Sequence, residues 1–184
     1  MRITSGTFRG RNLASPNSEL THPMGDREKL ALFNSLGDSV KDVVVLDLFA
    51  GSGALGLEAL SRGAKHVDFV ENSHPAVRTI KENIAVLDIS SRAKVFSQKA
   101  EVFLAYALTE EKKYDLILID PPYDKFTELF KSGSVLSELG KLLSPEGKLV
   151  LSHPGLVPPT EMFKGLTLRS SRKYARANIS IFEK

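Results

Sequence analysis

The sequence of 184 residues contains no cysteine. Disulfide frameworks, thiolate zinc sites, iron–sulfur clusters and cysteine nucleophiles are therefore excluded. Long hydrophobic runs are also missing, since no apolar stretch approaches the roughly 20 residues that cross a bilayer. The N-terminus contains no apolar signal segment either, so we expect a cytoplasmic protein that does not bind membranes.

The four histidines are scattered along the chain and do not have the spacing of metal ligands. We therefore expect no metal site. The charge, by contrast, is unevenly distributed. Residues 1–36 hold five basic side chains against three acidic ones, residues 161–184 hold six against two, and the centre has a net charge of −3. The two basic ends form a candidate phosphate-contacting surface, with an ordinary solvated surface as the alternative.

From residue 43 onward, short apolar runs alternate with helical patterns, which is typical of an α/β fold with a parallel sheet. The last two predicted strands, within residues 167–182, form an antiparallel pair at the edge of that sheet. Gly6 and Gly10 indicate a β-hairpin over residues 2–14. The predicted parallel strands cover residues 43–49, 66–71, 93–97, 114–119 and 148–152.

Two helices and a turn complete this prediction. Asp26 is expected to cap a helix over residues 27–36. A second helix is expected over residues 126–143, with a break near Gly133, followed by a turn at residues 144–147.

A glycine-rich segment, Gly51-Ser52-Gly53-Ala54-Leu55-Gly56, follows the first predicted strand and opens a helix. Glycines let the backbone approach a ligand closely, and a helix N-terminus offers unpaired N–H groups. The segment therefore favours a nucleotide-type ligand, although a tight turn that only needs glycine is the alternative.

Two acidic residues at the ends of predicted strands narrow the choice of ligand. Asp47 suits a cation, such as the amino group of a methionine moiety, and would repel a pyrophosphate. Glu71 can accept hydrogen bonds from ribose hydroxyls, which serves NAD and S-adenosylmethionine equally. Together they favour S-adenosylmethionine.

The motif Asp120-Pro121-Pro122-Tyr123 follows the fourth predicted strand, at the same edge of the sheet. Proline has no N–H and restricts the residue before it, so both proline carbonyls are expected to face outward as acceptors. The Asp120 carboxylate and the Pro121 carbonyl can accept the two protons of an exocyclic amino group, and Tyr123 can stack on a base. A proline-rich turn without a function is the alternative.

These motifs resemble those of the amino-methyltransferases of the class I, Rossmann-like fold, which has a mostly parallel seven-stranded sheet with helices on both faces and an antiparallel C-terminal strand. The patterns M-R-I-x-x-G-x-x-R-G-R at residues 1–11 and T-x-P-x-x-D-R-x-x-x-A-L-F-N-x-L at residues 21–36 narrow the resemblance. They are similar to those of the bacterial family that methylates N2 of a guanine in small-subunit (16S) ribosomal RNA. We accordingly divide the chain into an RNA-contacting extension, residues 1–24, and a methyltransferase domain, residues 25–184.

The resemblance implies S-adenosyl-L-methionine as cofactor, direct methyl transfer to a flipped-out base, and the assembled small ribosomal subunit as partner; a monomer is the default. It implies these cofactor-binding residues: Asp47, Phe49, Ala50, Gly51, Ser52, Gly53 and Glu71. It implies these catalytic residues: Asp120, Pro121 and Tyr123. The expected contacts to RNA are Arg2, Arg9, Arg11, Arg27 and Pro122.

Three other functions stay open from the residues alone. A DNA or RNA adenine-N6 or cytosine-N4 methyltransferase could use the same Asp-Pro-Pro-Tyr geometry, because that geometry serves any exocyclic amine. A non-catalytic RNA-binding module on this fold is disfavoured by the intact Asp47, Glu71 and Asp120. A nicotinamide dehydrogenase is disfavoured because no acid or base for its substrate is evident.

Overall fold

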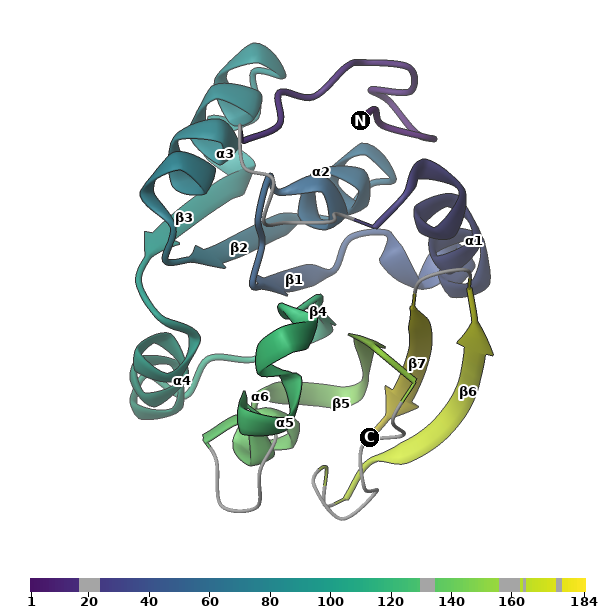
Figure 1. The fold of residues 1–184 in the computed structure, drawn as a ribbon, viewed down its shortest axis with the longest axis vertical. Helices are drawn as coiled ribbons and strands as arrows, with labels where there is room; N and C mark the ends of the chain where they lie inside the picture. Colours follow the sequence, from purple (N-terminus) through teal and green to yellow (C-terminus); the bar gives the residue numbers. More distant parts are fainter. Residues whose placement is uncertain (17–23, 130–134, 156–162, 164, 175–176) are drawn as a thin grey trace.

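One sheet of seven strands separates two layers of helices in the computed structural model (Figure 1). The structure describes the whole chain except residues 17–23, 130–134, 156–162, 164 and 175–176. The strands lie across the sheet in the order β3-β2-β1-β4-β5-β7-β6. They are β1 (Val44–Leu48), β2 (His66–Glu71), β3 (Ala93–Ser97), β4 (Tyr114–Ile119), β5 (Leu143–His153), β6 (Thr167–Lys173) and β7 (Asn178–Glu183).

Strand β7 runs antiparallel to both of its neighbours, whereas the strands from β3 to β5 pair in parallel. The predicted Rossmann-like α/β fold is therefore confirmed. The helices are α1 (Asp26–Leu36), α2 (Ala54–Ser61), α3 (His74–Val86), α4 (Ala100–Thr109), α5 (Phe126–Leu129) and α6 (Leu139–Leu142). Short 3-10 turns complete the described elements: η1 (Gly37–Val40), η2 (Ser90–Arg92), η3 (Tyr123–Lys125) and η4 (Val135–Glu138).

Side chains of the central strands alternate between two hydrophobic cores, one on each face of the sheet. Val45 joins the core beneath α1, α2 and α3. The next residue, Leu46, joins the core beneath α4 and α6. This explains why the apolar runs are continuous, since a strand covered on both faces has no solvent-facing position.

The parallel register brings the carboxyl ends of four strands to one edge. Leu48 is paired with Val70 and with Ile119, and Ile119 is paired with Leu151. The residues that follow these positions therefore lie at the same level of the sheet: Glu71, Asp120 and Ser152.

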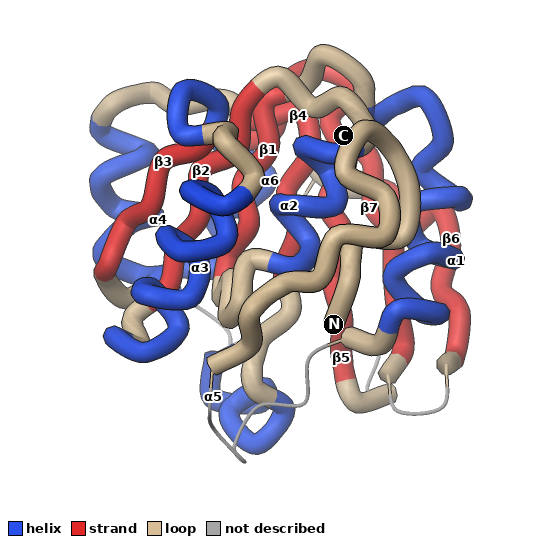
Figure 2. The backbone as a smooth tube through the Cα atoms, turned by 90° about the horizontal axis from the view of Figure 1, so that it is seen from above, coloured by secondary structure: helices blue, strands red, loops and turns tan. Residues whose placement is uncertain are grey.

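The first 16 residues form a short version of the predicted β-hairpin. Ile3 donates to the Arg11 carbonyl at 3.0 Å, and Gly10 and Leu13 donate to the Ile3 and Met1 carbonyls at 2.9 Å. A single antiparallel bridge joins Arg2 and Asn12, and no regular strand forms within these described residues. The reason is that backbone donors of this segment are used by α2: Thr4 donates to the Glu58 carboxylate and Thr7 to the Ser61 carbonyl, both at 2.8 Å. Figure 2 shows the segment crossing the outside of α2.

Three local predictions require correction. Helix α1 begins at Asp26 with Gly25 as its N-cap, so Asp26 is not the cap; its carboxylate pairs instead with Arg2 and Lys29. The helix expected over residues 126–143 is divided into α5, η4 and α6, and Gly133 lies outside the described residues. The expected turn at residues 144–147 lies within β5 as a bulge rather than before the strand, since β5 pairs with β4 at Leu143 and again only from Lys148, and Glu146 has a φ of 61°.

None of the helices in the described ranges is long and apolar enough to span a membrane.

Candidate active site

The glycine loop between β1 and α2 exposes its backbone to an approaching ligand. Gly51 and Gly53 have left-handed φ angles of 57° and 80°, and Phe49 before them has 61°. The turn is closed by the Gly53 N–H, which donates to the Ala50 carbonyl at 2.7 Å. A Cβ built at Gly51 would meet no atom within 4 Å, so the space beside this glycine can hold a ligand.

Gly56 serves packing rather than binding. A Cβ at this position would lie 2.4 Å from Cε1 of Phe69 on β2. The last glycine of the motif therefore allows α2 to pack closely on the sheet, whereas the first leaves room for a ligand.

Glu71, at the end of β2, holds the glycine loop in place. Its carboxylate accepts hydrogen bonds from the N–H groups of Gly51 at 2.9 Å and of Asn72 and Ser73 at 2.8 Å. A carboxylate has about four acceptor positions, so one remains for a ribose hydroxyl. The predicted ribose-binding residue thus has a structural role as well.

Asp47 is almost fully buried, with 1% of its surface exposed. Its carboxylate accepts a hydrogen bond of 2.9 Å from the N–H of Gly56 in the first turn of α2, so it also caps that helix. Burial raises the pKa of Asp47 well above its usual value; the Gly56 bond opposes this, and the carboxylates of Asp120 and Glu71 add to the rise. Three carboxylates thus converge on one site.

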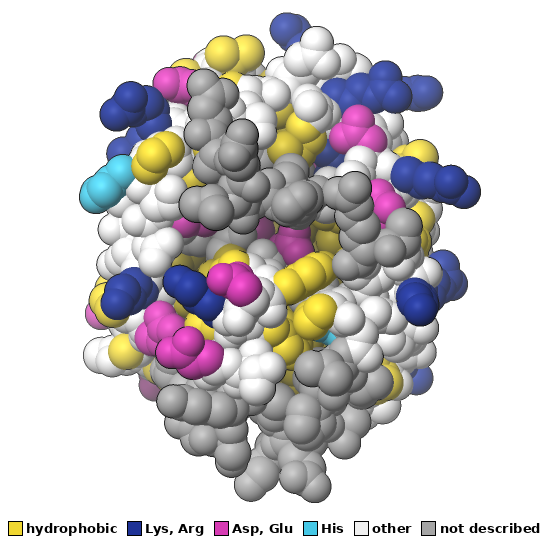
Figure 3. Space-filling model, viewed as in Figure 1, with side chains coloured by type: hydrophobic (Ala, Val, Ile, Leu, Met, Phe, Trp, Pro, Cys, Tyr) yellow, Lys and Arg dark blue, Asp and Glu magenta, His cyan; other side chains and the backbone are white. Residues whose placement is uncertain are grey.

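A cluster of carboxylates attracts a cation and repels a phosphate. Figure 3 shows Asp and Glu side chains at the hollowed centre of one face, with Lys and Arg side chains around its rim. The site therefore fits a cationic sulfonium and amino acid moiety better than a dinucleotide.

Asp120, Ser152 and Tyr123 form a hydrogen-bonded chain beside this cluster. The Tyr123 hydroxyl lies 2.7 Å from Ser152 Oγ, and Ser152 bonds in turn to the Asp120 carboxylate, which also accepts the N–H of Met24. Burial raises the pKa of Asp120 to about 6, although both of these hydrogen bonds lower it. Burial also raises the pKa of Tyr123, and the ring remains 36% exposed.

The two prolines of the motif differ in their exposure to solvent. Pro121 is buried, whereas Pro122 is exposed. The Pro122 carbonyl accepts the N–H of Lys125 at 3.2 Å within the η3 turn. The prediction that both carbonyls face outward as acceptors is therefore wrong for Pro122, because the chain turns immediately after it.

All four arginines predicted to contact RNA are exposed: Arg2, Arg9, Arg11 and Arg27. The Arg2 guanidinium lies 3.4 Å from the Asp26 carboxylate.

Sequence reasoning missed two residues of this region. Ser152 had a usable signal, because it is the last residue of a predicted strand beside the strand that ends at Asp120. Asn83 on α3 had none, yet its side chain joins the N-terminal segment to the glycine loop. Its amide contacts the backbone of Ala14 at 2.8 and 3.2 Å and the Ser52 carbonyl at 3.2 Å.

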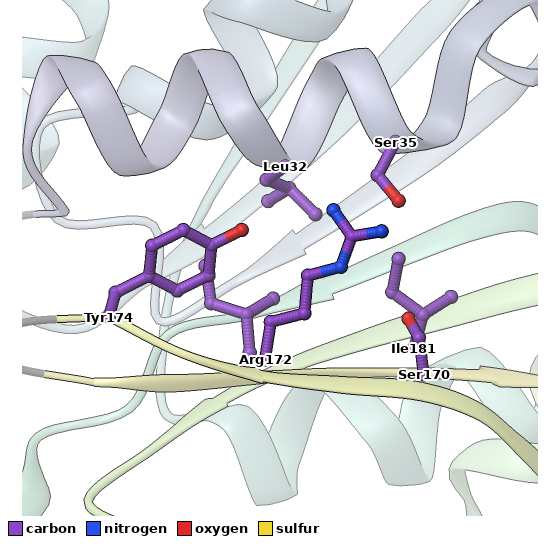
Figure 4. Close-up of a pocket in the computed structure, with 7 residues that line it drawn as sticks. Leu32, Ser35, Ser170, Arg172, Tyr174 and Ile181 are labelled. Carbon is purple, nitrogen blue, oxygen red and sulfur yellow. The ribbon is translucent and has the colours of Figure 1, made fainter.

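A shallow pocket lies elsewhere, between α1 and the strands β6 and β7 (Figure 4). Arg172 points from β6 toward Ser35 in the last turn of α1, and Tyr174 borders the pocket. That turn has no basic residue of its own, and a cation stabilises the C-terminal end of a helix. None of the residues that line this pocket belongs to the carboxylate cluster, so the two are separate.

Comparisons with known proteins agree with this geometry. The sequence model of the family described as "Conserved hypothetical protein 95" matches residues 1–183. "Putative rRNA methyltransferase YlbH" of Bacillus subtilis is 34% identical over 184 residues, which are 100% of this chain and 99% of that protein. "Ribosomal RNA small subunit methyltransferase D" of Haemophilus influenzae is 42% identical over 124 residues, 67% of this chain and 64% of that protein. The solved structure of "Putative methyltransferase yhhF" from Escherichia coli matches with a TM-score of 0.82 at 29% identity, covering 100% of this chain and 97% of that one.

Proposed function

The chain belongs to the family described as "Conserved hypothetical protein 95", and on that premise we propose that it methylates N2 of a guanine in small-subunit ribosomal RNA, using S-adenosyl-L-methionine. One observation carries the proposal: the Asp120 carboxylate and the exposed Tyr123 ring lie at the same edge of the sheet as the glycine loop and its carboxylates. The names of the relatives, which refer to ribosomal RNA, support the substrate class.

The residues present fit the proposed cofactor. Glu71 offers its remaining acceptor position to the ribose, and the open space beside Gly51 accepts the chain that links ribose to methionine. The carboxylates of Asp47 and Glu71 offset the positive charges of the cofactor. When bound, the cofactor supplies an electrophilic methyl group on a good leaving group.

Asp120 and Pro121 act on the base. The lone pair of an exocyclic amine is delocalised into the ring, so the amine is a poor nucleophile. Hydrogen bonds from its two protons to the Asp120 carboxylate and the Pro121 carbonyl strengthen as the nitrogen becomes tetrahedral and positive. Asp120 is ionised at neutral pH because its pKa is about 6, and it can accept the proton that the methylated nitrogen releases.

The tyrosine and the arginines act on the RNA. Tyr123 stacks on the flipped-out guanine, an interaction worth about 1–3 kcal/mol per base. The exposed side chains of Arg2, Arg9, Arg11 and Arg27 contact phosphates on either side of the target, beside the exposed Pro122. In this proposal, residues 1–24 are the RNA-contacting part, the partner is the assembled small subunit in the cytoplasm, and the protein acts as a monomer.

The proposal is tested by methyl transfer from labelled S-adenosylmethionine to purified small ribosomal subunits, naked ribosomal RNA and DNA. We expect labelling of the ribosomal substrate, with mass spectrometry assigning N2-methylguanosine. The variant Asp120→Ala should lose about 10²-fold or more in turnover with nearly unchanged cofactor affinity. Asp124→Ala, which removes an exposed carboxylate in the η3 turn, is the control.

Labelling of DNA, or of an adenine or cytosine in RNA, would reject guanine-N2 specificity while leaving the amino-methyltransferase chemistry in place. Failure to bind the cofactor in calorimetry would reject the enzyme itself.

A further inference from the structure

We infer that Ser152 is a positioning residue for methyl transfer, whose single hydroxyl orients both the acceptor Asp120 and the stacking ring of Tyr123. This inference rests on the proposed function. Ser152 is 1% exposed at the end of β5, and its Oγ lies 2.7 Å from the Tyr123 hydroxyl. Leu151 and Ile119 are register partners, so Ser152 and Asp120 follow at the same level of adjacent strands, where the serine hydroxyl bonds to the carboxylate. It therefore joins the two groups assigned to the acceptor base.

Donor counting fixes the direction of this chain of hydrogen bonds. An ionised carboxylate only accepts, and a serine hydroxyl has a single proton to donate. Ser152 therefore donates to Asp120 and accepts from the Tyr123 hydroxyl. The tyrosine holds the serine in the rotamer that serves Asp120, and the serine holds the phenol ring over the acceptor position.

The arrangement also determines how many acceptor positions of the Asp120 carboxylate remain for the substrate. The carboxylate accepts from Ser152 and from the Met24 N–H, which leaves about two of its four acceptor positions. Because both donors are fixed by the fold, these remaining positions are directed before the base arrives. Such preorganisation lowers the cost of aligning an amine with a methyl group.

The charged and titratable groups around Asp120 come from neighbouring elements. Asp47 faces it from β1, and the Tyr123 hydroxyl faces it from η3. His153, the next residue of β5, points to the opposite face of the strand and bonds to Ser180 Oγ on β7 at 3.0 Å. Loss of the Ser152 donor would thus leave Asp120 beside a second carboxylate with less compensation.

The test is an NMR titration of the Asp120 carboxyl carbon in the full-length protein, together with the pH dependence of kcat. In Ser152→Ala, we expect the pKa of Asp120 to rise by about one pH unit, because a hydrogen bond to the ionised form is removed. The acid limb of kcat should move upward equally, so that turnover falls several-fold at pH 6.5 and recovers at pH 8.5.

Three variants separate positioning from general stability. Ser180→Ala, another buried serine on the neighbouring strand, should leave the Asp120 titration unchanged. Tyr123→Phe keeps the ring and the Ser152 donor but removes the hydroxyl that fixes the serine rotamer. The pKa of Asp120 should therefore rise by less than in Ser152→Ala, while KM for RNA should rise because the ring loses its tether. Ser152→Thr keeps the hydroxyl and should restore the wild-type titration.

An Asp120 titration that is identical in wild type and Ser152→Ala would overturn the inference. If the wild-type protein transfers no methyl group to ribosomal substrates, the proposed function fails, yet the carboxyl titration still decides whether Ser152 controls Asp120.

Discussion

Two buried carboxylates contact helix α2, and they differ in the donors and charges that surround them. Glu58, within the helix, is surrounded by donors: it accepts from Thr4, Ser5 and the Arg62 guanidinium, and Lys29 Nζ lies 3.8 Å away. Asp47, near the start of the helix, has one hydrogen bond to the Gly56 N–H and two acidic neighbours.

This difference in charge compensation shows which buried carboxylate is available to a ligand. The negative charge of Glu58 is matched by cations of the chain itself, which fasten the N-terminal segment to α2. The negative charge of Asp47 is matched by no described cation, and burial together with Asp120 and Glu71 raises its pKa. The compensated charge of Glu58 stabilises the fold, whereas the uncompensated charge of Asp47 favours binding of a cationic ligand.

The largest effect is expected from Glu58→Gln. This change leaves the buried Lys29 with Asp26 as its remaining acidic partner in the described structure and takes the Glu58 carboxylate from the largely buried Arg62. It also removes an acceptor for the N-terminal backbone. Breaking a buried ion pair typically costs about 3–5 kcal/mol, so the free energy of unfolding in urea should fall by that order. Asp38→Asn, which breaks an exposed pair with Lys41, should change stability very little. Equal losses in the two variants would remove the distinction between the regions.

Substitutions at Gly56 and Gly51 should distinguish a glycine needed for packing from a glycine needed for cofactor binding. Gly56→Ala places a Cβ against Phe69, and such overpacking costs about 1–3 kcal/mol. The double variant Gly56→Ala with Phe69→Leu should recover part of this loss. Gly51→Ala meets no neighbour, but the φ of 57° strains an alanine by about 1–2 kcal/mol. Its methyl group also obstructs the ligand space, so cofactor affinity should fall by more than this strain accounts for. Calorimetry and urea denaturation measure the two quantities; unchanged affinity in Gly51→Ala would contradict the assigned loop.

Asp47→Asn should increase stability while weakening cofactor binding. The pKa of Asp47 is raised in the folded protein, so wild-type stability decreases as pH rises from the unfolded pKa of about 3.9 through the folded value. Asparagine avoids this loss and can still accept from Gly56. We expect a gain of about 1 kcal/mol at pH 7.5 that vanishes near pH 4. Asp68→Asn, whose carboxylate is matched by Lys112 and Tyr114, should instead lose stability.

The smallest effect is expected at the basic surface. Removing Arg9 and Arg11 together should lower the salt dependence of RNA binding by about one unit of slope per lost phosphate contact. Folding should be unaffected because both side chains are exposed. Lys41→Ala, near the amino end of β1, is the control. An unchanged slope would remove the N-terminal segment from the RNA surface.

The strands and the glycine loop could be located from the sequence because their signals are local. A continuous apolar run such as that of β4 marks burial on both faces, and Gly51, Gly53 and Asp120 directly follow such runs. The N-terminal hairpin was predicted only in part, since residues 1–3 pair with residues 10–13 but the backbone donors between them bond to Glu58 and Ser61, which lie more than 50 residues away. Local pattern contains no information about such distant partners.

The order of residues alone determined which segments become strands, where the chain turns closely past a ligand, and which carboxylates stand at strand ends. Only the tertiary structure decided that Glu58 is neutralised while Asp47 is not, and that Ser152 links Asp120 to Tyr123. The physical reason is that hydrogen bonds and charge compensation depend on distances between side chains, and parallel crossovers bring together residues that are far apart in sequence.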